Sequence, residues 1–477
     1  METAGQVVSL AARAPAAGRE TKLVRGMGLL DATMLVVGSM IGSGIFIVSA
    51  ESSRILGSPG WLLIAWTVAG VLTMIAALSC SELAAMLPQA GGQYVFFREA
   101  YGPLFGFLFG WTMFLVVQTG TIAAVAVAFA RFLGVLWPEI SGANVLLSVG
   151  GVSLSAVQAV ALVVVLLLTA SNATGLKTGT TTQNVFTFAK FAALLGLTVL
   201  GLALAKPDAA LRLPDFFRAA IPSGEPLAGL ALLMALGTAM VGPLFSQSAW
   251  NNVTFAGEEV KEPGRTLPRA LLLGCLLVTT LYVVANVAYL NVLSLAEIQH
   301  PPEDRVATAA VTKLFGPPAA AAMAAAIMVS TFGCVNGLIL SGARVSFAMA
   351  RDGLFFRSLE RVNRSSVPGN ALWAQALWSG VLVLWGSYSA LLKYVISVDI
   401  LFYVLLVLAV IVLRRKRPEW RRPFRAPGYP WLPLLYAAAG IVLIAVLLVG
   451  NPRTTWPGYA FVLTGVPVYF FWRGRKR

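Results

Sequence analysis

The stretch that decides the fold is Leu35-Val-Val-Gly-Ser-Met-Ile-Gly-Ser-Gly-Ile-Phe46. Its glycines lie in the middle of an apolar run, where each costs about 1 kcal/mol relative to alanine in a helix. One interpretation is close helix packing, because Gly38 and Gly42 have the spacing that lets two backbones approach. The other is a helix that unwinds at Gly42-Ser-Gly44 and offers backbone groups to a ligand, which at membrane depth requires a cavity. The stretch by itself leaves both interpretations open.

A second interrupted stretch lies in the other half of the chain: Val241-Gly-Pro-Leu-Phe-Ser-Gln-Ser-Ala-Trp-Asn-Asn-Val-Thr254. Pro243 removes a backbone donor and clashes with the preceding helical turn. Polar side chains follow it closely, namely Ser246, Gln247, Ser248, Asn251 and Asn252. A proline kink with interhelical hydrogen bonds is one explanation, but polar groups at this density usually face a cavity.

The composition indicates a membrane protein. Of the 477 residues, 58% are hydrophobic and 12% are charged, which is about half the charged fraction of a typical soluble domain. A bilayer-spanning helix needs about 20 apolar residues, and the chain contains about twelve such segments. We predict spans at residues 29–50, 61–87, 103–135, 147–170, 184–205, 226–256, 267–293, 318–343, 370–386, 391–413, 430–450 and 455–472.

The positive charges favour one orientation of these spans. The formal net charge is +15, and with the N-terminus inside, the basic residues concentrate in the segments assigned to the cytoplasm. The tail at residues 1–28 and the short segment 473–477 are therefore both expected in the cytoplasm. Because no single basic face with a recognition motif is present, the charge indicates topology and attraction to lipid headgroups, and we expect no nucleic-acid partner.

The two interrupted stretches occupy corresponding positions in two groups of five spans. The first opens residues 29–205, and the second lies in the first span of residues 226–413. A repeat with an odd number of spans places the two groups in opposite orientations, and paired interrupted helices of this kind indicate a transporter binding site. We predict an all-α integral membrane protein of the LeuT type, with 12 transmembrane helices, a 5+5 inverted repeat, discontinuous helices 1 and 6, and two C-terminal helices in residues 430–472.

The cysteine and histidine content argues against enzyme chemistry. Cys80, Cys275 and Cys334 all lie in apolar runs, and the single histidine is His300 in a polar stretch. This pattern fits neither a disulfide framework nor a metal site nor histidine-dependent catalysis. A nucleotide-binding loop of the P-loop type is also missing. We therefore expect no enzyme activity, no catalytic residue, no metal and no cofactor.

Four segments carry a family resemblance: Gly38–Phe46 and the residues at 82–102, 249–268 and 336–353. In order and spacing they resemble the amino acid–polyamine–organocation (APC) superfamily, and among its permeases the bacterial L-type amino acid transporter-like branch. One departure is Ser248-Ala249, where L-type members often have a glycine pair or Asp-Gly. Because serine and alanine are larger than glycine, we expect a slightly narrower pocket. Such a pocket favours small or medium neutral amino acids as substrates.

Helix dipoles and the resemblance together assign the substrate site. An unwound helix offers free N–H groups to a carboxylate at the start of its outer half, and free carbonyls to an ammonium at the end of its inner half. The resemblance places the substrate-binding residues at Met40, Ile41, Gly42, Ser43, Gly44 and Ile45, and at Phe245, Ser246, Ser248 and Asn251. It also implies that Phe245 gates the outer side. For Trp250, a gating role and ordinary packing remain open.

Lys190 is the one lysine well inside an apolar run. The sequence around Lys190 leaves open whether its side chain snorkels to the membrane interface or has a function. Sodium-independent family members have a lysine at the matching place, where its ammonium substitutes for a sodium ion. The resemblance therefore implies a cation or coupling site at which Lys190 bridges the first and eighth helices, with Ser330 and Thr331 as its partners.

Other polar and aromatic residues receive less specific expectations. Gln118, Thr119, Phe402 and Tyr403 are expected as pocket walls, and Glu82 in a structural pair on the cytoplasmic side. Glu258 and Glu259 are expected to pair with local Lys and Arg residues or to form an inner gate. Asp399 receives no role beyond a local pair with Lys393.

The resemblance predicts a secondary amino acid transporter that works by alternating access without sodium, as an exchanger or as a proton-coupled symporter. The alternatives are an amino-acid-sensing receptor, or a carrier of polyamines or cationic amino acids, on the same fold. The loop at residues 137–142 lacks the cysteine that joins animal L-type transporters to a heavy chain. We therefore expect a monomer with no disulfide-linked heavy-chain subunit. The amino-acid composition of the chain favours a location in the bacterial inner membrane.

Overall fold

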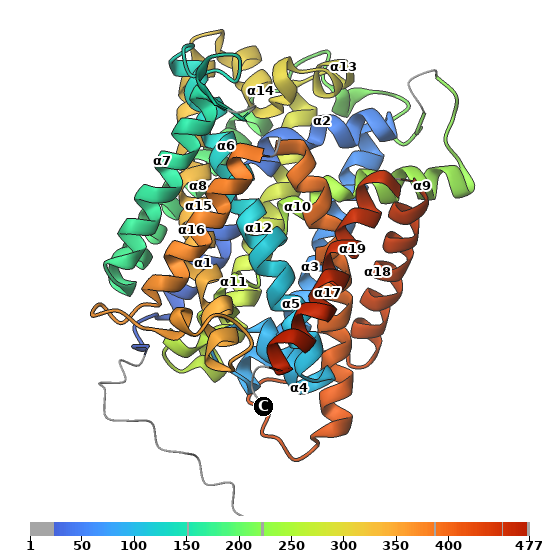
Figure 1. Cartoon of the computed structure of the whole chain (residues 1–477). Coiled ribbons are helices and arrows are strands. Elements are labelled where there is room, and N and C mark those ends of the chain that lie inside the picture. The colour runs from blue at the N-terminus through green and yellow to red at the C-terminus, as the bar shows by residue number, and fades with distance from the viewer. Residues whose placement is uncertain (1–22, 150–151, 221–223, 386–387, 451, 475–477) are drawn as a thin grey trace, which may run out of the picture.

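The computed structural model describes residues 23–149, 152–220, 224–385, 388–450 and 452–474. Most of the predicted N-terminal tail, and the last three residues of the predicted C-terminal segment, lie outside these ranges. Figure 1 shows a bundle of helices, with α13 and α14 at its upper end and α4 and the C-terminus at its lower end.

Helices account for most of the described chain, and their bounds follow in chain order. The first half contains α1 (Leu29–Met40), α2 (Gly44–Leu56), α3 (Pro59–Met86), α4 (Gln93–Tyr101), α5 (Pro103–Thr112), the π-helical η1 (Met113–Val117), α6 (Gln118–Leu136), β1 (Val145–Val149), β2 (Val152–Ser155), α7 (Ala156–Ala173), α8 (Leu176–Ala203), η2 (Ala210–Arg212) and α9 (Gly229–Ala239). The second half contains α10 (Val241–Ser246), α11 (Asn252–Phe255), η3 (Gly257–Glu259), α12 (Pro263–Val292), α13 (Leu295–Gln299), η4 (Pro302–Asp304), α14 (Val306–Phe315), α15 (Ala319–Arg351), η5 (Arg357–Glu360), α16 (Gly369–Trp385), α17 (Tyr388–Lys416), α18 (Trp431–Gly450) and α19 (Pro452–Gly474).

Each predicted span contains helix. Nine helical segments in the described ranges are long and apolar enough to cross a membrane. The other three predicted spans, at residues 370–386, 391–413 and 455–472, coincide with α16, α17 and α19. The prediction of a helical membrane bundle is therefore confirmed at this level.

The predicted start of the fourth span at residue 147 is wrong. Residues 145–149 and 152–155 instead pair as the antiparallel strands β1 and β2, and α7 begins only at Ala156. The Ser155 hydroxyl accepts a hydrogen bond from the Gln158 backbone N–H at 3.3 Å, and the Gln158 side chain caps the Ser155 N–H in return. This capping box fixes the helix start. The hydropathy pattern did not reveal these two strands, because they are as apolar as a membrane-spanning helix.

The first interruption has features of both interpretations. α1 ends at Met40 and α2 begins at Gly44, so the helix is discontinuous. The glycines also permit close packing, because a Cβ at Gly38 would overlap Gln183 of α8. A Cβ at Gly42 would lie 3.1 Å from the Cys334 sulfur of α15. Close packing on one side of the helix and unwinding of its backbone therefore occur together.

The second interruption has two parts, one on each side of α10. α9 ends at Ala239, four residues before Pro243, which has no backbone N–H to donate to the Ala239 carbonyl; the Ser52 hydroxyl donates to that carbonyl at 2.8 Å. Residues 247–251 are not helical and separate α10 from α11. Ala249 has φ of +64°, in the left-handed region that disfavours residues with a Cβ. The glycine pair expected from the family would fit this backbone without strain.

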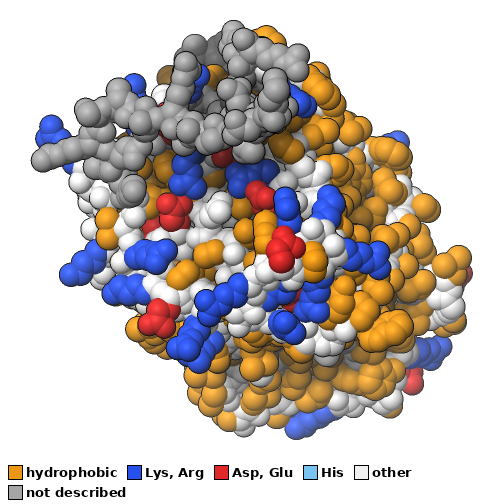
Figure 2. All heavy atoms as spheres, turned by 90° about the horizontal axis from the view of Figure 1, so that it is seen from below, with side chains coloured by type: hydrophobic (Ala, Val, Ile, Leu, Met, Phe, Trp, Pro, Cys, Tyr) orange, Lys and Arg blue, Asp and Glu red, His pale blue; other side chains and the backbone are white. Residues whose placement is uncertain are grey.

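Basic side chains gather at the lower end of the bundle, which Figure 2 shows face-on. The buried carboxylate of Glu82 contacts two of these basic side chains. The Glu82 carboxylate accepts hydrogen bonds from Arg414 at 2.6 and 2.8 Å and from the Ala426 backbone at 2.7 Å, and Arg422 lies 3.4 Å away. The predicted structural pair of Glu82 is confirmed, and it ties α3 to the segment that joins α17 and α18.

Candidate functional site

The two helix interruptions lie against each other. A Cβ at Gly44 would overlap the Ser246 side chain and come within 3.1 Å of the Ser246 Cα. The expected substrate-binding residues of the two stretches are thus neighbours, although they are about 200 residues apart in sequence. Glycine at position 44 permits this close approach.

The carbonyls of the first break are bonded to other helices. The Tyr282 hydroxyl of α12 donates to the Met40 carbonyl at 3.0 Å. The Ile41 carbonyl accepts from the Lys190 ammonium at 2.6 Å and from the Ser330 hydroxyl at 3.2 Å. A carbonyl oxygen has two lone pairs. In this conformation Ile41 therefore has no remaining acceptor position for a substrate ammonium.

Lys190 lies between the first and eighth predicted spans. Its side chain is only 1% exposed, and its ammonium donates to the carbonyls of Gly38, Ile41 and Ser330. Three carbonyl dipoles partly compensate the buried charge. A metal cation would be bound by oxygens in the same way. This geometry agrees with the bridging position expected for Lys190, whereas its role in coupling stays a prediction.

The two expected hydroxyl partners of Lys190 differ in what they contact. Ser330 offers its carbonyl to the ammonium at 3.3 Å, while its hydroxyl donates to the Ile41 and Gly42 carbonyls. The Thr331 hydroxyl donates to Ile327 and Met328 within its own helix. Ser330 therefore bridges α15 to the break directly, whereas the Thr331 hydroxyl bonds within α15.

The second break is fixed mainly by its own side chains. The Gln247 amide donates to the Trp66 carbonyl at 3.2 Å and accepts from Thr279 at 3.0 Å. The Asn251 amide donates to Gln93 at 3.0 Å, and the Tyr403 hydroxyl donates to Asn251 at 3.2 Å. Asn251 thus supports the break through hydrogen bonds to two other helices.

Sequence reasoning missed several supporting residues. Tyr282, Thr279 and Gln93 hold the two breaks, yet each is an ordinary polar residue in an apolar helix or at a helix start. The only available signal was their position at membrane depth, where polar side chains find a partner. Nothing in the sequence indicates which partner each one has.

Two cavities meet at Phe245. An upper cavity of about 340 Å³ is lined by residues of α2, α6, α9 and α10, and by residues 303–305. A smaller space of about 30 Å³ lies beside Ser248, Trp250, Asp399 and Tyr403. Phe245 lines both cavities. A ring in this position separates the outer space from the second break, which agrees with the expected gate.

Trp250 is 1% exposed and stacks on Tyr403, with ring centroids 5.3 Å apart and planes 26° apart. It therefore forms an inner wall of the smaller cavity. Of the other expected pocket walls, Tyr403 lines this cavity. Gln118 donates to the Leu338 carbonyl, Thr119 to the Phe114 carbonyl, and Phe402 packs on Phe97 and Phe109.

The upper cavity carries charged residues in its wall. Arg54 pairs with Asp304 at 2.7 Å, and Arg305 pairs with Glu303 at 2.5 Å. Burial lowers the pKa of the Arg305 guanidinium, while Glu303 opposes that effect and Arg131 adds to it. Arginine still keeps its charge in the physiological range. The cavity above Phe245 is thus lined by charged side chains of both signs, which suits a polar solute.

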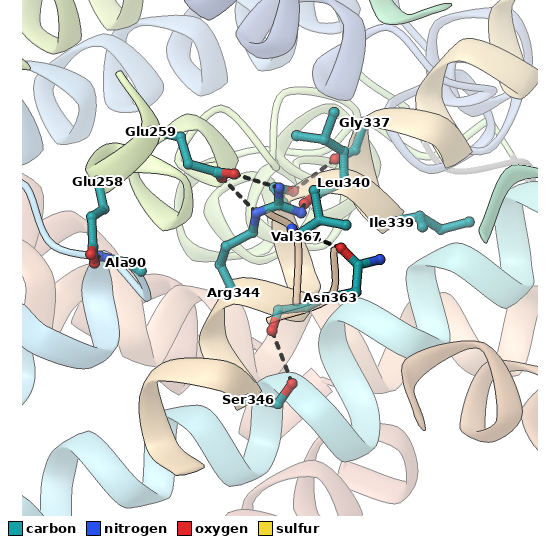
Figure 3. A network of polar contacts seen from close by, with 12 residues as sticks. Ala90, Glu258, Glu259, Gly337, Ile339, Leu340, Arg344, Ser346, Asn363 and Val367 are labelled. Atoms are coloured by element: carbon teal, nitrogen blue, oxygen red, sulfur yellow. Dashed lines mark hydrogen bonds and ion pairs between the residues drawn. The ribbon is translucent and has the colours of Figure 1, made fainter. Parts of the chain in front are cut away.

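The exit from the second break carries a buried ion pair (Figure 3). The Arg344 guanidinium of α15 donates to both oxygens of Glu259 at 2.8 and 2.9 Å, and the two side chains are 1% and 0% exposed. Glu258 forms a more exposed pair with Arg351 at 3.1 Å. Both acids pair with basic residues, but the prediction of local partners is wrong, because the partners are 85 and 93 residues away.

Comparison with known proteins identifies the family. A family model described as "Amino acid permease" matches residues 27–469. The chain belongs to the amino acid permease family. This permease is 31% identical over 457 residues to the serine/threonine exchanger SteT of Bacillus subtilis, covering 95% of this chain and 98% of SteT.

Two animal relatives agree with that assignment. The large neutral amino acids transporter small subunit 2 of Mus musculus is 31% identical over 483 residues, covering 99% of this permease and 86% of the relative. The Asc-type amino acid transporter 1 of Mus musculus is 28% identical over 474 residues, covering 97% and 84%. The expected membership of the APC superfamily is thereby confirmed. The relatives are transporters and exchangers rather than enzymes.

Proposed function

We propose that this protein is a secondary amino acid transporter that works by alternating access on a LeuT-type fold. Its repeats are residues 29–205 and 226–413 in opposite orientations, followed by two further helices in residues 430–472. The observation that carries the proposal is the contact between the two helix breaks at Gly44 and Ser246. Irregular backbone at membrane depth is tolerated where it faces a cavity or a ligand.

The substrate's charged groups bind between the two breaks. The first-turn N–H groups of α2 at Gly44 and Ile45, with Ser43 before them, receive the carboxylate, because such groups lack acceptors within the helix. The ammonium is received by carbonyls at the two breaks. The carbonyls of Met40, Ile41 and Phe245 each already accept hydrogen bonds from two donors. Ser246 and Ser248 are therefore the remaining acceptors among the expected residues.

Phe245 is the outer gate, and the buried pair of Glu259 and Arg344 closes the inner side. The cavity above Phe245 then faces outward, and the basic lower end with both termini faces the cytoplasm, as the positive-inside rule requires. Transport needs Phe245 to move aside and the inner pair to separate in turn.

Transport proceeds without sodium, because the Lys190 ammonium occupies the place of a cation between α1, α2 and α15. Its carbonyl contacts support this assignment. Exchange of substrates needs no change in the charge of this ammonium, whereas a proton-coupled mechanism would require Lys190 to lose its proton. Neutral amino acids of small or medium size are the favoured substrates, in line with the serine/threonine exchanger among the relatives.

The protein acts as a monomer in a bacterial inner membrane without a disulfide-linked heavy chain. One relative is named as a small subunit. In this chain, Cys80, Cys275 and Cys334 are all described, and each is a buried free thiol. A buried thiol is inaccessible to a disulfide partner outside the bundle.

The proposal is tested by uptake of a panel of labelled amino acids into proteoliposomes. The internal amino acid, sodium and the pH gradient are varied one at a time. Uptake that requires internal amino acid identifies exchange, and stimulation by an inward proton gradient without it identifies symport. Dependence on sodium would contradict the role of Lys190. If no amino acid is transported, a receptor or a polyamine carrier becomes the better explanation.

A further inference from the structure

Lys190 and Asp399 are the two charged residues expected well inside apolar spans. The side chain of Lys393, the expected local partner of Asp399, lies outside the described residues. Lys190, in contrast, is bonded to three carbonyls of described residues. The helices that carry those carbonyls are also joined further along α8, by a second set of polar contacts.

These contacts form a row of hydrogen bonds across four helices. Asn172 of α7 donates to the Asn336 side-chain oxygen at 2.8 Å, and Asn336 of α15 donates to the Gln183 oxygen at 2.9 Å. Gln183 of α8 donates to the Thr187 hydroxyl at 3.3 Å, which donates to the Met34 carbonyl of α1 at 3.2 Å. We refer to the four side chains Asn172, Asn336, Gln183 and Thr187 as the amide bridge.

The amide bridge lies entirely inside the protein. Its side chains are at most 3% exposed. An amide buried at membrane depth is costly unless its polar groups are bonded. Both N–H groups of the Asn336 amide are used, because the second donates to the Gly179 carbonyl at 3.2 Å. Loss of one member would therefore leave its neighbours with unpaired polar groups.

Three glycines on three helices leave room for the amide bridge. A Cβ at Gly38 of α1 would overlap the Gln183 side chain. A Cβ at Gly337 of α15 would lie 3.0 Å from Gln183 Nε2, and one at Gly179 of α8 would lie 2.5 Å from the Asn172 oxygen. The spacing of these helices is thus matched to the amide side chains between them.

The amide bridge and Lys190 join the same helices at two levels. Gln183 and Lys190 are seven residues apart, so they lie along one face of α8, about 10 Å apart along its axis. Gln183 is bonded to α15 through Asn336, and its Nε2 lies 3.5 Å from the Met34 carbonyl of α1. Lys190 donates to carbonyls of α1 and α15. The spacing of α1 and α15 is therefore held once by neutral groups and once by a charge.

The contacts of Lys190 depend on that spacing. Its bond to the Ser330 carbonyl is 3.3 Å long, and a hydrogen bond is lost at slightly greater separation. The Ser330 hydroxyl spans the same gap to the Ile41 and Gly42 carbonyls at 3.2 and 3.3 Å. A small movement of α15 away from α1 would break these bonds together. A residue that fixes the spacing therefore acts on the cation site without touching it.

We propose that Gln183 is a positioning residue for the Lys190 site, because it holds α1 and α15 at the spacing at which their carbonyls converge on the ammonium. Gln183 is the central member of the amide bridge, since its oxygen accepts from α15 and its Nε2 faces Thr187 and α1. The inference rests on the proposed function, in which Lys190 takes the place of a cation.

The first test is a double-mutant cycle on stability. Residues that lie about 10 Å apart and act independently have additive effects. Gln183→Leu removes the side-chain hydrogen bonds at similar volume, and Lys190→Ala removes the ammonium. Thr198→Val is the matched control, because Thr198 is also buried on α8, lies eight residues from Lys190 and donates to a carbonyl of its own helix. Unfolding in detergent gives the equilibrium constant of each variant.

We expect the combined effect of Gln183→Leu and Lys190→Ala on the unfolding equilibrium constant to be about tenfold smaller than the product of the single effects. The two losses overlap, because either one releases the same carbonyls. Thr198→Val with Lys190→Ala should match the product within about twofold. If Lys190→Ala does not fold, Ser330→Ala takes its place in the cycle, since the Ser330 hydroxyl spans the same gap.

The second test is amino acid uptake into proteoliposomes. Gln183→Leu should lower the maximal rate about tenfold and leave KM within about twofold, because the substrate contacts at the two breaks are unchanged. Thr198→Val should change neither value. Additive effects in the Gln183–Lys190 cycle, or an unchanged maximal rate in Gln183→Leu, would overturn the inference and leave the proposed function intact. Absence of transport by the unmodified protein would contradict the proposed function, while the stability cycle would still decide on Gln183.

Discussion

The two helix breaks solve the same physical problem in different ways. At the first break, other helices supply donors to its carbonyls, through Lys190, Ser330 and Tyr282. At the second break, the chain supplies Gln247 and Asn251 from the break itself. The first break thus depends on a buried positive charge, and the second on neutral amide side chains.

The charged side chains beside the two breaks differ in how completely they are bonded. Lys190 is bonded to three carbonyls, whereas Asp399 has no bond to a described residue. A charge whose contacts are complete within the protein acts on the structure around it.

The largest expected effect lies at the exit of the second break. Glu259→Gln leaves the Arg344 charge buried without its partner and should destabilise the protein by about 3–5 kcal/mol. Glu258→Gln is the control, because its pair with Arg351 is more exposed and is worth about 0–1 kcal/mol. Unfolding in detergent measures both variants. Equal losses would show that the burial of the Glu259 pair has no energetic consequence.

At the first break, Lys190→Ala should destabilise the protein by about 2–4 kcal/mol, because buried carbonyls lose their donor. Amino acid uptake should fall to background. Lys177→Ala changes an exposed lysine on the same helix and should behave like the unmodified protein. Unchanged uptake in Lys190→Ala would remove the assignment of this residue to the cation site.

The second break should tolerate the loss of one amide better. Asn251→Ala removes the bonds to Gln93 and Tyr403 and should cost about 1–3 kcal/mol. Asn144→Ala, at an exposed position, should stay within about 0.5 kcal/mol. Thermal unfolding and substrate affinity are measured together. A cost larger than that of Lys190→Ala would reverse the ranking of the two breaks.

The smallest expected effect has the opposite sign. Ala249→Gly should stabilise the protein by about 0.5–1 kcal/mol, because glycine adopts the φ of +64° without the Cβ penalty. Ala235→Gly, inside α9, should destabilise by a similar amount. Denaturant unfolding of the two variants gives the sign. Destabilisation by Ala249→Gly would mean that the alanine methyl group contributes packing that outweighs the backbone strain.

Local features of the sequence predicted most of the fold. The apolar runs located a helix in each of the twelve spans, and Gly42 to Gly44 marked the end of one helix and the start of the next. The helix of the fourth span begins later than predicted, because hydropathy does not distinguish the apolar strands at residues 145–149 and 152–155 from a helix. Pro243 marked the boundary between α9 and α10, because it cannot donate to the carbonyl four residues earlier, but it gave no signal for the non-helical residues 247–251 that follow.

The sequence by itself determined where the backbone leaves the helix and which charges lie at membrane depth, because apolar content, glycine and proline act locally. Only the tertiary structure decided what those groups contact. It placed Tyr282 on the Met40 carbonyl, turned the Thr331 hydroxyl to its own helix, and left Asp399 beside Ser248. These contacts depend on the packing of helices that are distant in sequence, and no local pattern encodes that packing.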